Sequence, residues 1–144
     1  MKPADFISKL EEHRIISAIA EAEKKTSGEI RVYISRKNRP DAFAFAQKRF
    51  LALGMTKTRD RNAVLIYIVP RQRTFAVIGD VAVHEKCGEA FWQETVGLMS
   101  RSFKEEKFTD ALVHGVEKVG QLLAAHFPRR SDDSNQLPNT LIED

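Results

Sequence analysis

The fold is decided by one apolar stretch in the middle of the chain, Ala63-Val64-Leu65-Ile66-Tyr67-Ile68-Val69. An unbroken apolar run of this length, rich in β-branched side chains, is typical of a central strand that is covered on both faces. A turn sequence follows, Pro70-Arg71-Gln72-Arg73, and residues 74–78 then show a second strand pattern that ends at Gly79-Asp80. The short link between the two strands predicts an antiparallel hairpin.

A further strand is predicted upstream, at residues 29–35, where Ile30, Val32 and Ile34 alternate with more polar residues. A helix pattern that begins at Asp41 and ends at Gly54 separates this strand from the central one. Two strands joined by a crossover helix run parallel, with a right-handed connection. We therefore expect the strands at 29–35 and 63–69 to be parallel.

Helices are predicted at both ends of this strand region. Residues 8–27 carry an apolar stripe at helical spacing, with a capping box, Ser8-Lys9-Leu10-Glu11, at the start and Gly28 as the residue after the last turn. Two more helices follow the hairpin, and Pro128 ends the second. The order of elements predicts an α/β fold, a three-layer α/β/α sandwich whose small mixed sheet has helices on both faces.

Composition limits the class of protein. The chain has 144 residues, of which 42% are apolar and 30% charged, and this fits one domain, expected at residues 1–128. Residues 129–144 are polar, which predicts a disordered tail. The single cysteine excludes an intramolecular disulfide and a multi-cysteine zinc site.

The ends of the chain and its charge bear on location and partners. No apolar run approaches the roughly 20 residues that span a bilayer, and no signal peptide is visible at the N-terminus. We expect a cytoplasmic monomer with no transmembrane segment. The net charge of +3 is ordinary for this size, so no nucleic-acid partner is expected.

Polar side chains flank three strands at the same predicted edge of the sheet. The starts of the two parallel strands and the end of the third meet there, which brings together Glu29, Asp60, Asn62 and Asp80. Carboxylate and amide oxygens are the ligands that calcium and magnesium take, so the sequence predicts a divalent-cation site.

These residues also have a purely structural interpretation. Asp60 and Asn62 are common turn formers, and Asp80 is placed to cap the next helix. Glu29 would then pair with Arg31 or Arg61.

The opposite edge is basic. It collects Arg36, Lys37, Arg39, Arg71 and Arg73. Because ligands of open α/β sheets favour the carboxyl ends of the parallel strands, an anion site at this edge is a second hypothesis. The alternative is that these charges protect the sheet edge and aid solubility. The sequence contains no Gly-rich phosphate loop, nucleophile elbow or zinc-protease helix, so no catalytic residue is assigned.

Several stretches over residues 8–128 resemble the TPM domain family, in its short soluble bacterial type. The stretches are Ile15-x-x-Ala18-Ile19-x-x-Ala22-Glu23, Thr26-x-Gly28-Glu29-Ile30-x-Val32, Thr58-x-x-Arg61-Asn62-x-Val64-Leu65-Ile66-Tyr67, Gly79-Asp80, Trp92 and Leu123-x-x-His126-Phe127-Pro128. Many members add an N-terminal signal and a membrane helix, which this sequence lacks, and the usual Gly after Asn62 is Ala63 here.

The resemblance implies a small mixed sheet between helices and a range of activities. Some members are described as phosphatases and some as calcium or magnesium binders, and several act in stress responses or modulate membrane proteins. The leading hypothesis is therefore an accessory or binding domain with a cation site at the acidic edge. The alternatives are a weak metal-assisted acid phosphatase, with Arg59 and Arg61 beside Asp60, and an adaptor that docks to a membrane protein or another protein partner.

Overall fold

The apolar run in the middle of the chain forms β2, Val64–Val69, and all its side chains are buried. β2 pairs with β1, Ile30–Ile34, in parallel and with β3, Thr74–Gly79, in antiparallel orientation. The computed structural model describes residues 2–130 and 139–143. The remaining elements are α1 (Pro3–Ser8), α2 (Glu12–Glu23), α3 (Ala42–Ala52), η1 (Met55–Lys57), η2 (Pro70–Gln72), α4 (Val81–Lys104), α5 (Phe108–His126) and β4 (Ile142–Glu143).

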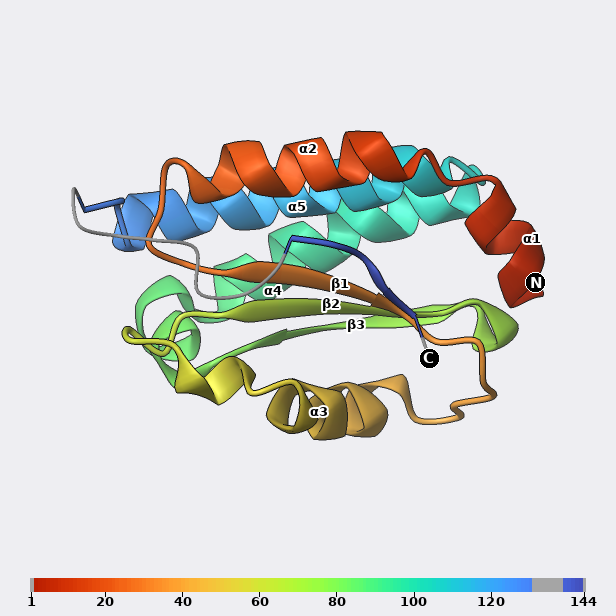
Figure 1. Cartoon of the computed structure of the whole chain (residues 1–144), viewed down its shortest axis with the longest axis horizontal. Coiled ribbons are helices and arrows are strands. Elements are labelled where there is room, and N and C mark those ends of the chain that lie inside the picture. Colours follow the sequence, from red (N-terminus) through yellow and green to blue (C-terminus); the bar gives the residue numbers. More distant parts are fainter. Residues whose placement is uncertain (1, 131–138, 144) are drawn as a thin grey trace.

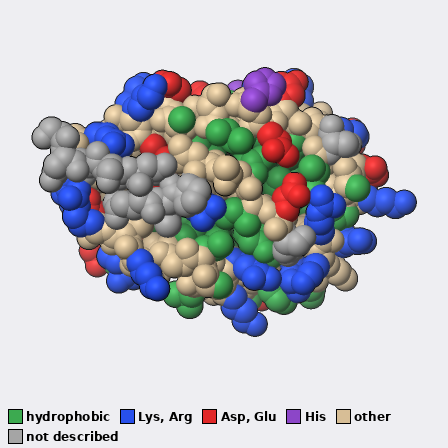
Figure 2. All heavy atoms as spheres, viewed as in Figure 1, with side chains coloured by type: hydrophobic (Ala, Val, Ile, Leu, Met, Phe, Trp, Pro, Cys, Tyr) green, Lys and Arg blue, Asp and Glu red, His purple; other side chains and the backbone are tan. Residues whose placement is uncertain are grey.

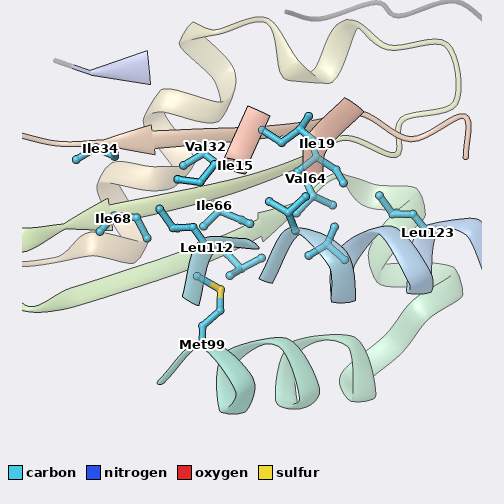
Figure 3. Packing of buried hydrophobic residues seen from close by; sticks show 14 of the residues in the cluster. Ile15, Ile19, Val32, Ile34, Val64, Ile66, Ile68, Met99, Leu112 and Leu123 are labelled. Atoms are coloured by element: carbon cyan, nitrogen blue, oxygen red, sulfur yellow. The ribbon is translucent and has the colours of Figure 1, made fainter. Parts of the chain in front are cut away.

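The sheet lies between two helical layers, as the sequence predicted. Figure 1 shows α2, α4 and α5 on one face of the sheet and α3 on the other. Alternate residues of β1 and β2 therefore belong to two cores: Val32 and Ile66 face α2 and α5, whereas Tyr33 and Tyr67 face α3. Figure 3 shows how Met99 and Leu112 close the larger of these cores. The three-layer α/β/α prediction is confirmed.

The first predicted helix is two helices. α1 ends at Ser8 and α2 runs only from Glu12 to Glu23, so Ser8 is not the N-cap of the long helix. Residues 24–29 leave the helix because they pair with the chain that follows α5. The Ser27 amide donates to the Phe127 carbonyl at 3.0 Å, and the Arg129 amide donates to the Lys25 carbonyl at 3.2 Å. These contacts fix the path from α2 into β1.

Gly28 is required for close packing and does not end a helix in a left-handed conformation. A Cβ atom at this position would lie 2.8 Å from Leu123 Cδ1 and 3.3 Å from the Asn62 carbonyl oxygen. We expect Gly28→Ala to lower the free energy of unfolding by about 1–2 kcal/mol through overpacking. Gly97→Ala is the matched control, because a Cβ there meets nothing within 4 Å and alanine favours the helix. Urea unfolding checks both, and equal effects of the two changes would contradict this role of Gly28.

A fourth strand was not predicted. β4 pairs in parallel with β1, with Tyr33 opposite Ile142, so the sheet order is β3-β2-β1-β4. Leu141, just before β4, packs against the larger core and Ile142 against the smaller one. Residues 142 and 143 of the expected tail at residues 129–144 are thus part of the sheet, and residues 131–138 and 144 lie outside the described part of the chain.

Candidate functional site

The predicted acidic edge is defined by the backbone of three strands. The amide of Val64 donates to the Glu29 carbonyl at 2.8 Å, and the amide of Asp80 donates to the Ala63 carbonyl at 2.9 Å. The starts of β1 and β2 and the end of β3 therefore lie side by side, as topology predicted. Glu29, Asn62 and Asp80 are nearly or fully buried there.

Asp80 holds the junction between β3 and α4. Its side chain is 4% exposed, and its Oδ1 accepts a hydrogen bond from the Val81 amide at 2.8 Å, as the N-cap of α4. Arg61 binds the same carboxylate with both ends of its guanidinium, Nε to Oδ2 at 2.6 Å and Nη2 to Oδ1 at 2.8 Å. Asp80 therefore caps α4, as the structural interpretation of this residue predicts. The phosphatase alternative assigned Arg61 to phosphate binding, but in the structure Arg61 binds Asp80.

Asp60 and Asn62 have different environments. Asp60 is partly exposed and its Oδ2 accepts from Arg130 Nη2 at 2.7 Å. Asn62 is completely buried, and its Nδ2 donates to Ser27 Oγ at 3.0 Å. Its Oδ1 has no hydrogen-bond donor among the residues that the structure describes. A buried acceptor without a donor is uncommon and often marks a place for water or an ion.

Glu23 is the residue at this edge that the sequence reasoning missed. It is 5% exposed, its Oε2 accepts from the Ile30 amide at 2.8 Å, and it hydrogen-bonds to Glu29, which is 2% exposed. Burial, and next the hydrogen bond with Glu29, raise the pKa of Glu23 to about 9. Glu23 therefore carries its proton at neutral pH and can donate it in the hydrogen bond to Glu29. The sequence carried a signal, since Glu23 continues the buried stripe of Ile15 and Ile19 on α2.

A buried arginine balances this pair. Arg31 is 8% exposed, and its charge interacts with both Glu23 and Glu29 while burial lowers its pKa. Arg129 adds a hydrogen bond from Nη1 to the Glu23 carbonyl oxygen at 2.8 Å. We call Glu23, Glu29 and Arg31 the edge cluster.

The four predicted cation ligands do not converge on one point in this conformation. Within residues 2–130 and 139–143, no group of three His, Cys, Asp or Glu side chains is placed to hold a metal ion. Glu29, Asn62 and Asp80 share the edge, but Asp80 and Asp60 each bind an arginine. Asn62 instead donates to Ser27 Oγ, and Glu29 lies against Glu23 and Arg31 in the edge cluster.

The basic residues at the other edge have different surroundings. Arg36 binds Glu143 at 3.2 Å and accepts from Arg71 Nε on its carbonyl oxygen at 2.8 Å, whereas Arg39 stacks over the Phe45 ring at 4.5 Å. The Lys37 side chain is exposed, and Arg73 borders a pocket on the far side of the turn. Figure 2 shows Lys and Arg side chains gathered over the end of the sheet where β2 turns into β3. An anion site at this edge stays a prediction.

The fold and the edge define a small α/β/α domain with a polar sheet edge and buried carboxyl groups. The family model of the TPM domain matches residues 1–122, and the chain belongs to this family. Among the described helices, none is both long enough and apolar enough to cross a membrane.

Solved structures of other proteins are similar to the chain, including those of the following two proteins. The BA42 protein from the psychrophilic bacterium Bizionia argentinensis has a TM-score of 0.88 and 40% identity, over 93% of this chain and 92% of that one. The N-terminal domain of the cg2496 protein from Corynebacterium glutamicum has a TM-score of 0.57 and 18% identity, over 92% and 77% of the two chains, and shares the fold alone. No curated protein matches the chain.

Proposed function

We propose that this protein is a TPM-type accessory domain that binds a divalent cation, calcium or magnesium, at the acidic edge of its sheet. The observation that carries the proposal is a concentration of buried oxygen acceptors there: the carboxyl groups of Glu29 and Glu23, and Asn62 Oδ1, which has no donor among the described residues. Hard oxygen acceptors at one edge are the chemistry that these cations require. Stress response or membrane-protein maintenance is the cellular setting that the family resemblance implies.

The four predicted ligands contribute differently in this proposal. Glu29 and Asn62 supply oxygens from the buried part of the edge. Asp60 and Asp80 contribute only where they release Arg130 and Arg61, since both carboxylates are bound by these arginines in the structure. Such an exchange of partners lowers affinity, so we expect binding in the range of about 0.1–1 mM, as in weak calcium modules.

Titration with calcium and with magnesium, followed by NMR and thermal melting, tests the proposal. We expect amide shifts confined to the residues around Ile30, Ala63 and Asp80, and a rise in Tm of about 3–10 °C at about 10 mM metal. Glu29→Gln removes a ligand charge and is expected to abolish both responses. Glu21→Gln is the matched control, because Glu21 is exposed on the outer side of α2 and binds Lys24.

A lack of edge shifts at about 10 mM of either cation would overturn the proposal. Equal loss of response in the Glu29 and Glu21 variants would do the same, because it would indicate only a nonspecific effect of charge.

A further inference from the structure

A pocket of about 360 Å³ lies at the other end of the sheet from the acidic edge. Four phenylalanines from four different elements form its apolar wall: Phe6 of α1, Phe75 of β3, Phe103 of α4 and Phe108 of α5. Their rings are packed together, with centroids 4.9 Å apart for Phe6 and Phe108 and 5.3 Å apart for Phe75 and Phe103. Figure 1 shows α1 at the end of the sheet where β2 turns into β3. This volume and this lining are those of a small-molecule site.

The lining of the pocket includes three charged residues as well as the apolar ones. Arg73 and Lys104 border it, and both side chains are exposed. Neither forms an ion pair with another side chain in the part of the chain that the structure describes, in contrast to Arg36, Arg61 and Arg130. Glu106 is the acidic residue on the rim, so the three side chains carry a net charge of +1 (2 − 1). That charge complements a monoanion better than a phosphate dianion.

The backbone at the rim is held in an unfavourable conformation at two positions. Arg73 has φ 51° and Glu106 has φ 57°, and the third non-glycine residue with positive φ among those described is Arg61. Residues other than glycine are uncommon in this left-handed region and cluster at ligand-binding sites. Both rim residues lie in the short turns that link β2 to β3 and α4 to α5, so the strain belongs to the turns that shape the pocket opening.

We propose that this pocket binds a free amphipathic monocarboxylate with an unbranched acyl chain. The acyl chain would lie against the four phenylalanine rings, and Thr74 and Ser100 are the uncharged polar residues of the lining. The carboxylate would bind Arg73 and Lys104 at the opening. An acyl chain without polar groups matches the apolar lining of the pocket. The single negative charge of the carboxylate matches the net positive charge of the rim.

Decanoate is the probe, and isothermal titration calorimetry and NMR are the measurements. We expect a Kd of roughly 10–500 µM for a ligand of this size, with shifts in the rings that line the pocket. Decanol lacks the charge and is expected to bind at least about fivefold more weakly. Decyltrimethylammonium carries the opposite charge and is expected not to bind.

Two substitutions locate the site. Arg73→Gln is expected to weaken decanoate binding at least about fivefold. Arg71→Gln is the matched control, because Arg71 lies in the same turn but donates to the Arg36 carbonyl, and its loss should leave the Kd within about twofold. Ser100→Phe fills the pocket from α4 without removing a core side chain and is expected to abolish binding.

Each outcome of these experiments either supports or overturns the proposed monocarboxylate site. Weaker binding by the Arg73 variant with an unchanged Arg71 variant supports the proposal. Equal binding of decanoate and decanol, equal effects of Arg73→Gln and Arg71→Gln, or decanoate binding that persists in a folded Ser100→Phe variant would overturn it. Association with phosphatidylglycerol vesicles in the absence of any decanoate binding would also overturn it, because the ligand would then be a membrane surface.

Discussion

An Asp80→Ala variant is expected to unfold with a free energy about 2–4 kcal/mol below that of the unsubstituted protein. The Asp80 carboxylate is 4% exposed and accepts from three donors: the Val81 amide and two nitrogens of Arg61. Its loss removes the cap of α4. The Val81 amide and the Arg61 guanidinium then bind water or have no hydrogen-bond acceptor. The Arg61 side chain is 46% exposed, so its charge contributes little to stability. Most of the lost free energy of unfolding therefore comes from the cap of α4 and from the buried Asp80 carboxylate.

A second substitution separates the two roles of Asp80. Asp80→Asn keeps an oxygen for the Val81 amide but loses the charge that binds Arg61, and it is expected to lower the free energy of unfolding by about 1–2 kcal/mol. Asp110→Ala is the control, since Asp110 is 38% exposed and binds Arg14 at the start of α5, and it should lower that free energy by less than about 1 kcal/mol. Urea unfolding measures all three variants. If Asp80→Ala matched Asp110→Ala, the structural role assigned to Asp80 would be wrong.

The strands and their order could be predicted because their pattern is dense and periodic. The run at residues 63–69 permits no amphipathic helix face. The crossover helix between β1 and β2 and the short turn between β2 and β3 then leave one arrangement for these three strands. β4 escaped prediction for the opposite reason. Its two residues are too short for any period, and they form a strand only because the free edge of β1 offers hydrogen-bond partners.

The acidic edge could be predicted as a place but not as a set of contacts. Strand direction decides which residues reach an edge, and that follows from topology. Which arginine binds Asp80 depends on the left-handed turn at Arg61, with φ 53°, and no local pattern indicates this for an arginine. Glu23 could have been predicted from the sequence. An acidic residue on the apolar stripe of α2 is buried, and a buried carboxyl group needs a hydrogen-bond or charged partner.

The pKa of Glu23 predicts an unusual dependence of stability on pH. The unfolded chain loses this proton near the ordinary value of 4.5, whereas the folded protein holds it up to about pH 9. Between these values the folded state binds more protons than the unfolded state, so the free energy of unfolding falls as pH rises. The contribution is complete below pH 4.5, declines by up to about 1.4 kcal/mol per pH unit, and is lost near pH 9.

Glu23→Gln is expected to remove this slope. Glutamine keeps an oxygen for the Ile30 amide and gains an NH₂ group that can donate to Glu29, so it imitates the protonated glutamate at every pH. We expect the variant to match the unsubstituted protein near pH 5 and to exceed its free energy of unfolding by about 2 kcal/mol or more at pH 8–9. Urea unfolding in metal-free buffer across this range measures the difference.

Two further variants decide whether the buried pair is the cause. Glu29→Gln is expected to make the same slope shallower without removing it, because burial still raises the pKa of Glu23 and only the contribution of Glu29 is changed. Glu21→Gln should leave the slope unchanged, since Glu21 is exposed and Lys24 lowers its pKa. A parallel decline in the unsubstituted protein and in Glu23→Gln would contradict a protonated Glu23. Glu23 would then be ionised, with the Ile30 amide as its hydrogen-bond donor and Arg31 and Arg129 as the nearby cations.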